Sequence, residues 1–268
     1  MIAPKATLEK LGIIPNKALG QNFIADENSV SRIAEIALVS GKNAIEIGSG
    51  LGTLTEYLCK TAKTVTAIEI DSRMAEATRT NLSNVSNLTV IRADFLKVVP
   101  STLENIPTVA VGNLPYYITT PICLKLIQDY TTLENMTLMV QSEAAHRFFA
   151  PPGDRVYSIL SVLTALYFDA KEEISLPKSA YYPTPDIDST VVTFKRKRAA
   201  EPFHREFCAF IRSCFLMRRK TFLNNLLVRY EKDEILNALD KCALSHDIRA
   251  EKIPPEGLLA FFKMISNL

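Results

Sequence analysis

The sequence has few of the residues that build metal centres and disulfide frameworks. Its 268 residues include three histidines and five cysteines, and no two cysteines have C-x-x-C spacing. This composition argues against a zinc site and against a set of disulfides. We therefore expect no bound metal and a reducing, cytoplasmic environment in which the cysteines stay free.

Long hydrophobic runs are also missing. The longest strongly apolar stretch, residues 159–168, is about half the length needed to cross a bilayer. Residues 1–22 have neither the apolar core of a secretory signal nor the arginines of a transit peptide. We expect a protein without a membrane segment, and the 47% hydrophobic and 22% charged residues are typical of a globular chain.

The net charge of +2 conceals an uneven distribution. Up to Thr190 the chain has 16 Lys and Arg against 20 Asp and Glu, whereas from Val191 onward it has 15 against 9. A basic final third favours an anionic partner held by the C-terminal part, although a solvated helical surface is an equally good explanation from composition alone.

Strands and helices are expected to alternate along the first two thirds of the chain. Runs of β-branched and apolar residues predict strands at 43–47, 64–70, 88–91, 108–111, 136–140 and 191–195. Helical spacing predicts helices at 26–39, 53–59, 72–82, 121–129 and 158–166, and then only helices, at 203–215, 219–229, 232–241 and 256–265. This order predicts an α/β fold with a parallel sheet, residues 1–198, followed by a small all-helical domain, residues 199–268.

Three strand ends carry residues suited to an adenosine. After the first strand comes Gly48-Ser49-Gly50-Leu51-Gly52, a turn in which the backbone can approach a ligand closely, although a plain tight turn has the same pattern. Glu69 ends the second strand and can accept from both ribose hydroxyls, and Asp94 after the third can accept from an adenine amino group. An unrelated salt bridge explains either acid singly, but not the succession. No P-loop is present, which argues against a triphosphate.

The fourth strand ends in Asn113-Leu114-Pro115-Tyr116. Proline holds the residue before it extended. The Asn113 side-chain oxygen and the Leu114 carbonyl can therefore both accept from one exocyclic amino group, and Tyr116 offers a face on which a base can stack. The alternative is a strand-to-helix turn with an aromatic plug.

These motifs resemble those of the KsgA (RsmA) family of ribosomal small-subunit RNA adenine dimethyltransferases. The resemblance runs from about Lys17 to the C-terminus. Its motifs are Lys17–Ile24, Glu46–Gly52, Asp94, Asn113–Tyr116, Met139–Arg147, Tyr181–Ser189 and Phe215–Thr221. Departures from the family pattern are Tyr117, Ser142, Ser158 and Tyr181. They bear on RNA docking and rate more than on the type of reaction.

The resemblance implies a Rossmann-like class I methyltransferase sheet that uses S-adenosylmethionine, with the arm of residues 1–25 contributing to the cofactor site. It places at the cofactor Asn22, Ile24, Gly48, Gly50, Glu69, Asp94 and Asn113. It assigns the target adenine to Asn113, Leu114, Pro115 and Tyr116, with Tyr181 packing on the base. Arg218, Arg219 and Lys220, expected on one helix, are candidates for RNA contact.

The implied reaction is transfer of two methyl groups to N6 of each of two adjacent adenosines near the 3′ end of 16S rRNA, by a monomer acting on the small (30S) subunit during ribosome biogenesis. One alternative is a 23S rRNA methyltransferase of the resistance type with the same core. A non-catalytic assembly factor would predict an eroded glycine turn or acceptor pair, and neither is eroded. A small-molecule or DNA methyltransferase poorly explains the basic tail.

Overall fold

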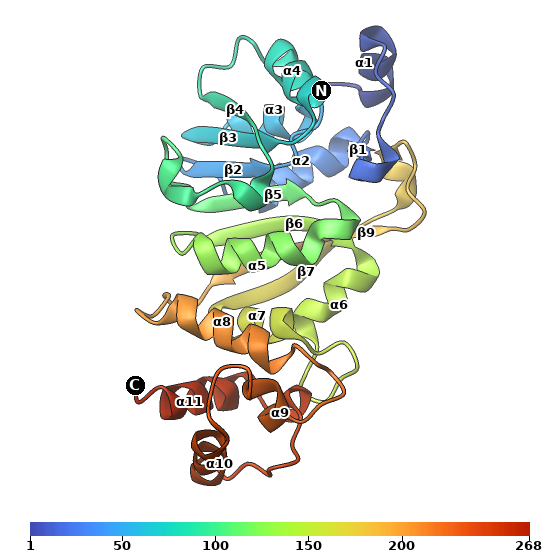
Figure 1. The fold of residues 1–268 in the computed structure, drawn as a ribbon. Coiled ribbons are helices and arrows are strands. Elements are labelled where there is room, and N and C mark those ends of the chain that lie inside the picture. Colours follow the sequence, from blue (N-terminus) through green and yellow to red (C-terminus); the bar gives the residue numbers. More distant parts are fainter. The chain divides into compact units, whose positions relative to one another are not determined.

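A seven-stranded sheet organises the first part of the protein. The computed structural model describes all 268 residues, and the strands are ordered β4-β3-β2-β5-β6-β9-β7 (Figure 1). Their bounds are β2 Asn43–Ile47, β3 Thr64–Glu69, β4 Leu88–Arg92, β5 Val109–Asn113, β6 Asn135–Gln141, β7 Phe168–Leu176 and β9 Ser189–Arg196. Strands β2 to β6 pair in parallel and β9 pairs antiparallel with β6. The predicted α/β fold with a parallel sheet is confirmed.

Helices connect the strands and bury the sheet. The connecting helices are α2 Glu27–Ile36, α3 Thr53–Cys59, α4 Ser72–Asn81 and α5 Thr119–Asp129. Val30 and Ile33 of α2 and Leu58 of α3 are fully buried against β2, β3 and β5. Two parallel neighbouring strands need a connection that returns the chain to the starting edge of the sheet. Helices that make this connection also cover the faces of the sheet.

The N-terminal residues form an arm that is tied to the sheet unit. Helix α1 (Pro4–Leu11) precedes a short strand, β1 (Phe23–Ile24), which pairs antiparallel with β8 (Tyr181–Tyr182). Neither helix α1 nor this two-stranded ribbon was predicted, because two-residue strands carry no periodicity. The ribbon joins residues more than 150 positions apart in the sequence, and it fixes the arm beside the glycine turn through the buried side chain of Phe23.

The remaining helices form a second compact unit. By its contacts the chain divides into Met1–Ala145 with Ala170–Arg196, and His146–Asp169 with Lys197–Leu268. The sequence-based division at 198/199 assigned residues 146–169 to the first domain, whereas α7 (Ile159–Tyr167) packs on helices of the C-terminal unit. The other helices of this unit are α8 His204–Cys214, α9 Phe222–Leu226, α10 Lys232–Lys241 and α11 Pro255–Ile265, and the division falls within α6 (Ser142–Phe149). Phenylalanine rings fill the core, with the Phe222 and Phe261 centroids 4.8 Å apart.

One sequence expectation about secondary structure is wrong, and two longer elements were missed. The helix expected at 219–229 extends only over α9, so Arg218, Arg219 and Lys220 lie in the loop between α8 and α9. Helix α6 and strand β7 were missed. The sequence of strand β7 shows little alternation of apolar and polar residues, because it carries several charged residues such as Lys171 and Glu172. The strand lies at the edge of the sheet, where charged side chains commonly protect against pairing with another chain.

Candidate active site

One cavity lies at the carboxyl ends of the parallel strands. The cavity is open, and the empty space between its walls, including part of the solvent at its opening, is about 960 Å³. All its lining residues belong to the sheet unit. Five segments supply the lining: the arm at 19–24, the glycine turn after β2, the end of β3, the residues after β4, and the end of β5 with the turn that follows. Ligands bind at this edge in open α/β sheets, because successive strands deliver their loops to it.

The glycine turn requires glycine at three positions. Gly48, Gly50 and Gly52 have φ angles of 78°, 57° and 89°, which side chains with a Cβ rarely adopt. At Gly50 an added Cβ would lie 2.8 Å from Cε1 of Phe23. The turn is therefore shaped both by its backbone conformation and by the arm that packs on it.

Glu69 lies between the turn and the start of helix α4. Its side chain is 6% exposed, and its two oxygens accept hydrogen bonds from the backbone N–H groups of Gly50 and Asp71, each at 2.9 Å. Burial raises the pKa of Glu69, and these backbone hydrogen bonds oppose the rise. Each oxygen keeps a lone pair for another donor, so the carboxylate can accept from a ribose.

Asp94 caps the short helical turn at Phe95–Lys97. Its Oδ1 accepts from the backbone N–H of Leu96 at 3.0 Å, which holds the carboxylate at the rim of the cavity. The second oxygen remains available to a ligand amino group. Gly48, Glu69 and Asp94 thus follow or end three neighbouring strands and line the same cavity.

Asn113, the last residue of β5, is oriented by the arm. Its Nδ2 donates to the backbone carbonyl of Asn22 at 2.8 Å. Since the amide nitrogen is held in this way, Oδ1 remains as the acceptor of the side chain. The arm reaches this position because Gly20, with φ of 63°, packs closely on Pro115, where an added Cβ would lie 3.4 Å from the Pro115 Cβ.

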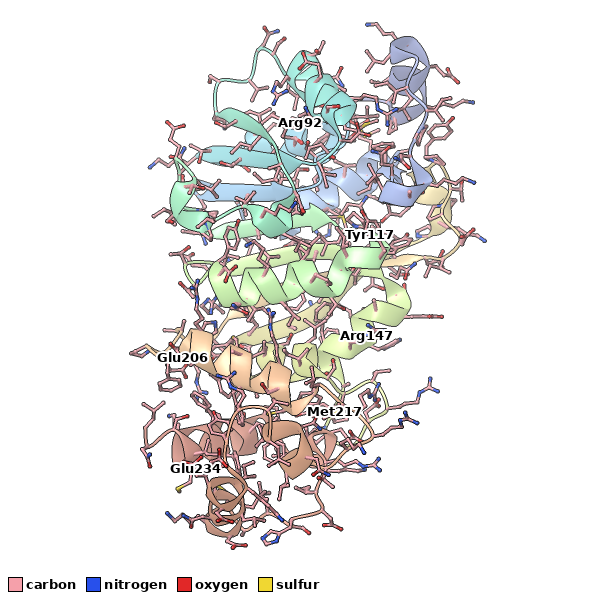
Figure 2. All side chains as sticks on the ribbon, in the orientation of Figure 1. Arg92, Tyr117, Arg147, Glu206, Met217 and Glu234 are labelled. Atoms are coloured by element: carbon pink, nitrogen blue, oxygen red, sulfur yellow. The ribbon has the colours of Figure 1, made fainter.

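The predicted site residues divide into three groups. All seven residues assigned to the cofactor line the cavity, and Pro115 does so too. Leu114, Tyr116 and Tyr181 lie beside it: Leu114 and Tyr181 are buried, and the Tyr116 hydroxyl lies 3.4 Å from Oγ of Ser189. Arg218, Arg219 and Lys220 are exposed in the C-terminal unit, in the loop that follows Met217 (Figure 2).

Sequence analysis missed several lining residues. Gln21 lines the cavity beside Asn22, and Tyr117, 57% exposed, lines it in place of its neighbour Tyr116 (Figure 2). Ile70 lies between the two acids Glu69 and Asp71 and is 49% exposed. A single exposed isoleucine is common on protein surfaces, so the sequence carried no signal for its place in the cavity.

Nearly all of the chain matches one known family. The family model described as ribosomal RNA adenine dimethylase matches residues 14–267. The chain belongs to this family. The prediction of a ribosomal RNA adenine dimethyltransferase with a class I methyltransferase fold is thus confirmed.

Individual relatives agree with the family. The chain is 38% identical over 262 residues to "Ribosomal RNA small subunit methyltransferase A" of Listeria monocytogenes, covering 92% of this chain and 89% of the relative. A dimethyladenosine transferase from Plasmodium falciparum matches in structure with a TM-score of 0.76 and 26% identity, over 91% of this chain and 98% of that one. The 23S rRNA methyltransferase ErmE matches with a TM-score of 0.63 and 27% identity, over 91% and 99%.

Two kinds of feature are absent from the structure of the dimethylase. No helix in the structure has the length and apolar character needed to span a membrane. No group of three or more His, Cys, Asp or Glu side chains is arranged to hold a metal ion.

Proposed function

We propose that this dimethylase transfers methyl groups from S-adenosylmethionine to N6 of two adjacent adenosines near the 3′ end of 16S rRNA in the small ribosomal subunit, two methyl groups to each. The name of the Listeria relative supports the small subunit as the source of the RNA. The observation that carries the proposal is the fixed amide of Asn113, with its Oδ1 free to accept a hydrogen bond at the mouth of a cavity suited to a nucleoside.

The residues of the cavity fit the proposed cofactor. Glu69 has lone pairs for a ribose, Asp94 has an oxygen for an adenine amino group, and the glycine turn leaves room for the chain to approach a ligand. Asn22, Ile24, Gly48, Gly50 and Asn113 would complete this binding site. When bound, S-adenosylmethionine supplies a methyl group on a positively charged sulfur, which is a strong electrophile without further activation.

The protein's own contribution is positioning. Asn113 Oδ1 and the Leu114 carbonyl would accept both protons of the target amino group, which leaves the nitrogen lone pair directed into the cavity. Pro115 keeps Leu114 extended, and Tyr116 and Tyr181 would pack on the base. An adenine inside a helix cannot present its amino group in this way, so the target must be unpaired or flipped out.

The C-terminal unit would supply RNA contacts. Arg218, Arg219 and Lys220 are exposed, and no residue of this loop is needed for the cavity. Cations along a backbone path provide affinity for structured RNA, whereas shape provides much of the selection. We further propose that the enzyme acts as a monomer in the cytoplasm, where small subunits are assembled.

One experiment tests the proposal directly. The purified protein is incubated with labelled S-adenosylmethionine and either small ribosomal particles that lack the modification or protein-free large-subunit RNA, and the labelled nucleotides are then mapped. We expect label on two adjacent adenosines of the small-subunit RNA. Label on the large-subunit RNA alone would instead support the resistance-type activity, and no label on either RNA would support an assembly factor without catalysis.

A further inference from the structure

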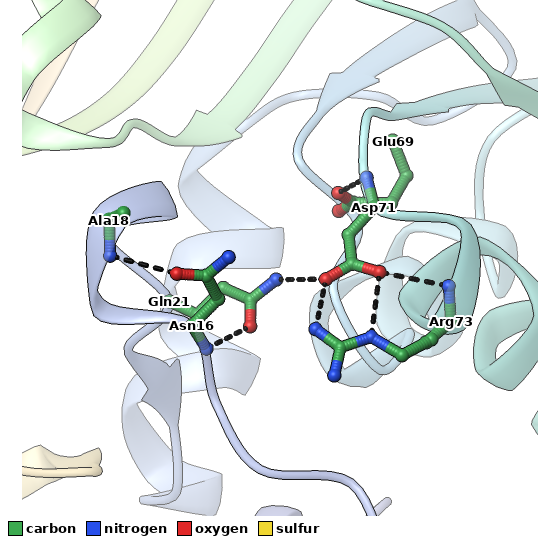
Figure 3. A network of polar contacts seen from close by, with 6 residues as sticks. All are labelled: Asn16, Ala18, Gln21, Glu69, Asp71 and Arg73. Atoms are coloured by element: carbon green, nitrogen blue, oxygen red, sulfur yellow. Dashed lines mark hydrogen bonds and ion pairs between the residues drawn. The ribbon is translucent and has the colours of Figure 1, made fainter.

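A chain of hydrogen bonds connects the end of β3 to the arm (Figure 3). Asp71, at the start of α4, accepts from Gln21 Nε2 at 2.9 Å and from the Arg73 guanidinium at 2.7 and 3.2 Å. Gln21 in turn accepts from the backbone N–H of Asn16 at 2.7 Å. One glutamine side chain therefore bridges the base of the arm and the carboxylate next to Glu69.

Asp71 is a rigid anchor for this glutamine. Its side chain is 6% exposed, and its backbone N–H is held by Glu69, while Oδ1 also accepts from the backbone N–H of Arg73. The hydrogen bonds from Arg73 lower the pKa of Asp71 to about 2, with Gln21 adding to the effect, so the carboxylate is ionised at neutral pH. A neutral donor paired with a fixed carboxylate makes a stronger hydrogen bond than one with a neutral acceptor.

The residue after Gln21 carries the carbonyl that orients Asn113. Asn22 is held on its C-terminal side by the pairing of β1 with β8, where Phe23 faces Tyr182 and Ile24 faces Tyr181. This ribbon is only two residues long in each strand. On the other side of Asn22 the backbone forms a short turn, Lys17–Leu19, rather than a strand. There Gly20 packs on Pro115, and the Gln21 side chain adds a hydrogen bond to Asp71.

We propose that Gln21 is a positioning residue for methyl transfer: by binding Asp71 it fixes the Asn22 carbonyl, and through that carbonyl it fixes the amide of Asn113. Gln21 needs no contact with the reacting atoms for this role. The inference rests on the proposed function of Asn113, but its structural half concerns the free protein.

Two substitutions separate the hydrogen bond from the shape of the side chain. Gln21→Met keeps the length and removes the donor, whereas Gln21→Lys keeps a donor for Asp71; both lose the acceptor for Asn16. Glu76→Gln, on an exposed ion pair of the same helix α4, serves as the control. Turnover is measured at saturating S-adenosylmethionine, and the Asn113 side-chain amide is followed by ¹⁵N NMR of the protein without ligand, with Asn113→Ala used for assignment.

We expect Gln21→Met to lower turnover roughly tenfold and to move the Asn113 amide signals towards those of solvent-exposed amides. Gln21→Lys should stay within about threefold of the wild type in turnover and keep its amide signals. The proposal is overturned if Gln21→Met leaves the amide signals in place, if it moves them without slowing turnover, or if both substitutions act alike. Should the wild type prove inactive on ribosomal RNA, the proposed function fails, and the amide signals alone still decide whether Gln21 orients Asn113.

Discussion

The amide nitrogen of Asn113 donates to the backbone carbonyl of Asn22 at 2.8 Å, across 91 positions of the sequence. This contact decides which end of the side chain faces the cavity. An asparagine free to rotate would present donor and acceptor equally, and a donor facing the target amino group would repel it. The arm therefore supplies the orientation that the Asn-Leu-Pro-Tyr motif needs.

Replacing Asn113 by alanine should lower turnover by about a hundredfold, because one of two acceptors for the target amino group is lost. Cofactor affinity should largely persist, since Glu69, Asp94 and the glycine turn are untouched. Steady-state methylation and calorimetric titration measure the two effects. Asn87→Ala is the matched control: its amide also donates to backbone carbonyls, those of Cys59 and Ala62, and its loss should affect stability alone. Turnover within roughly threefold of the wild type would remove Asn113 from its role.

Tyr116 should act through its ring and not through its hydroxyl. The hydroxyl makes only a long contact of 3.4 Å with Ser189, so Tyr116→Phe should leave turnover nearly unchanged. Tyr116→Ala removes a stacking surface worth on the order of 1–3 kcal/mol and should lower turnover by about tenfold or more. Equal losses in both variants would instead assign the effect to the hydroxyl. Tyr117→Ala in the same assay shows whether the neighbouring ring, which lines the cavity, contributes.

Local pattern predicted most of the sheet unit. Strand Asn43–Ile47 has three apolar residues, Ala44, Ile45 and Ile47, and glycine follows it directly, so strand and turn are both visible in the sequence. The edge strand β7 was missed because its charges protect an edge and hide the alternation. Helical spacing also led to the prediction of a helix through Arg219 and Lys220. The structure instead has a loop there, which ends at Thr221, the residue that caps α9.

The candidate site was predictable only in part. Gly48, Glu69, Asp94 and Asn113 stand at strand ends, which places them at one edge of a parallel sheet whatever the details of packing. The contacts of Asn22 and Gln21 depend instead on the path of the arm across the site. That path is set by pairing with Tyr181 and Tyr182 and by packing of Gly20 on Pro115, and no local signal in the sequence encodes either.

Gly50→Ala should weaken both the fold and the cofactor site. Its φ of 57° costs an alanine about 1–2 kcal/mol. The new Cβ would also meet the Phe23 ring at 2.8 Å and strain the hydrogen bond from Gly50 N–H to Glu69. Gly41→Ala, with φ of 68° and no atom within 4 Å of its Cβ, isolates the backbone cost. Denaturant unfolding and cofactor titration compare the two, and equal destabilisation with unchanged affinity would refute the role of the turn.

Glu46 should make the protein less stable as the pH rises. It is 2% exposed, and burial raises its pKa to about 8, although Thr55 donates to it at 2.6 Å. Between the unfolded pKa near 4.5 and about 8, the folded state holds more protons than the unfolded state, so stability falls with pH across this window. Glu46→Gln keeps an acceptor for Thr55 and removes the titration. Its stability relative to the wild type should increase by at least about 1 kcal/mol from pH 5 to pH 8; a constant difference in unfolding free energy would contradict the raised pKa.

The loop after α8 should contribute to RNA affinity through charge alone. Arg219 and Lys220 are exposed, whereas Arg218 is held by the backbone carbonyl of Arg155, so the first two are the better test. Each cation that meets a phosphate releases counterions, and neutralising both by Gln should make the slope of log K against log salt shallower by about 1.5. Lys171→Gln, on an exposed ion pair of β7, is the control and should leave the slope unchanged. If the double variant binds small-subunit RNA with the slope of the wild type, these cations face solvent in the complex and the basic final third of the chain holds the RNA elsewhere.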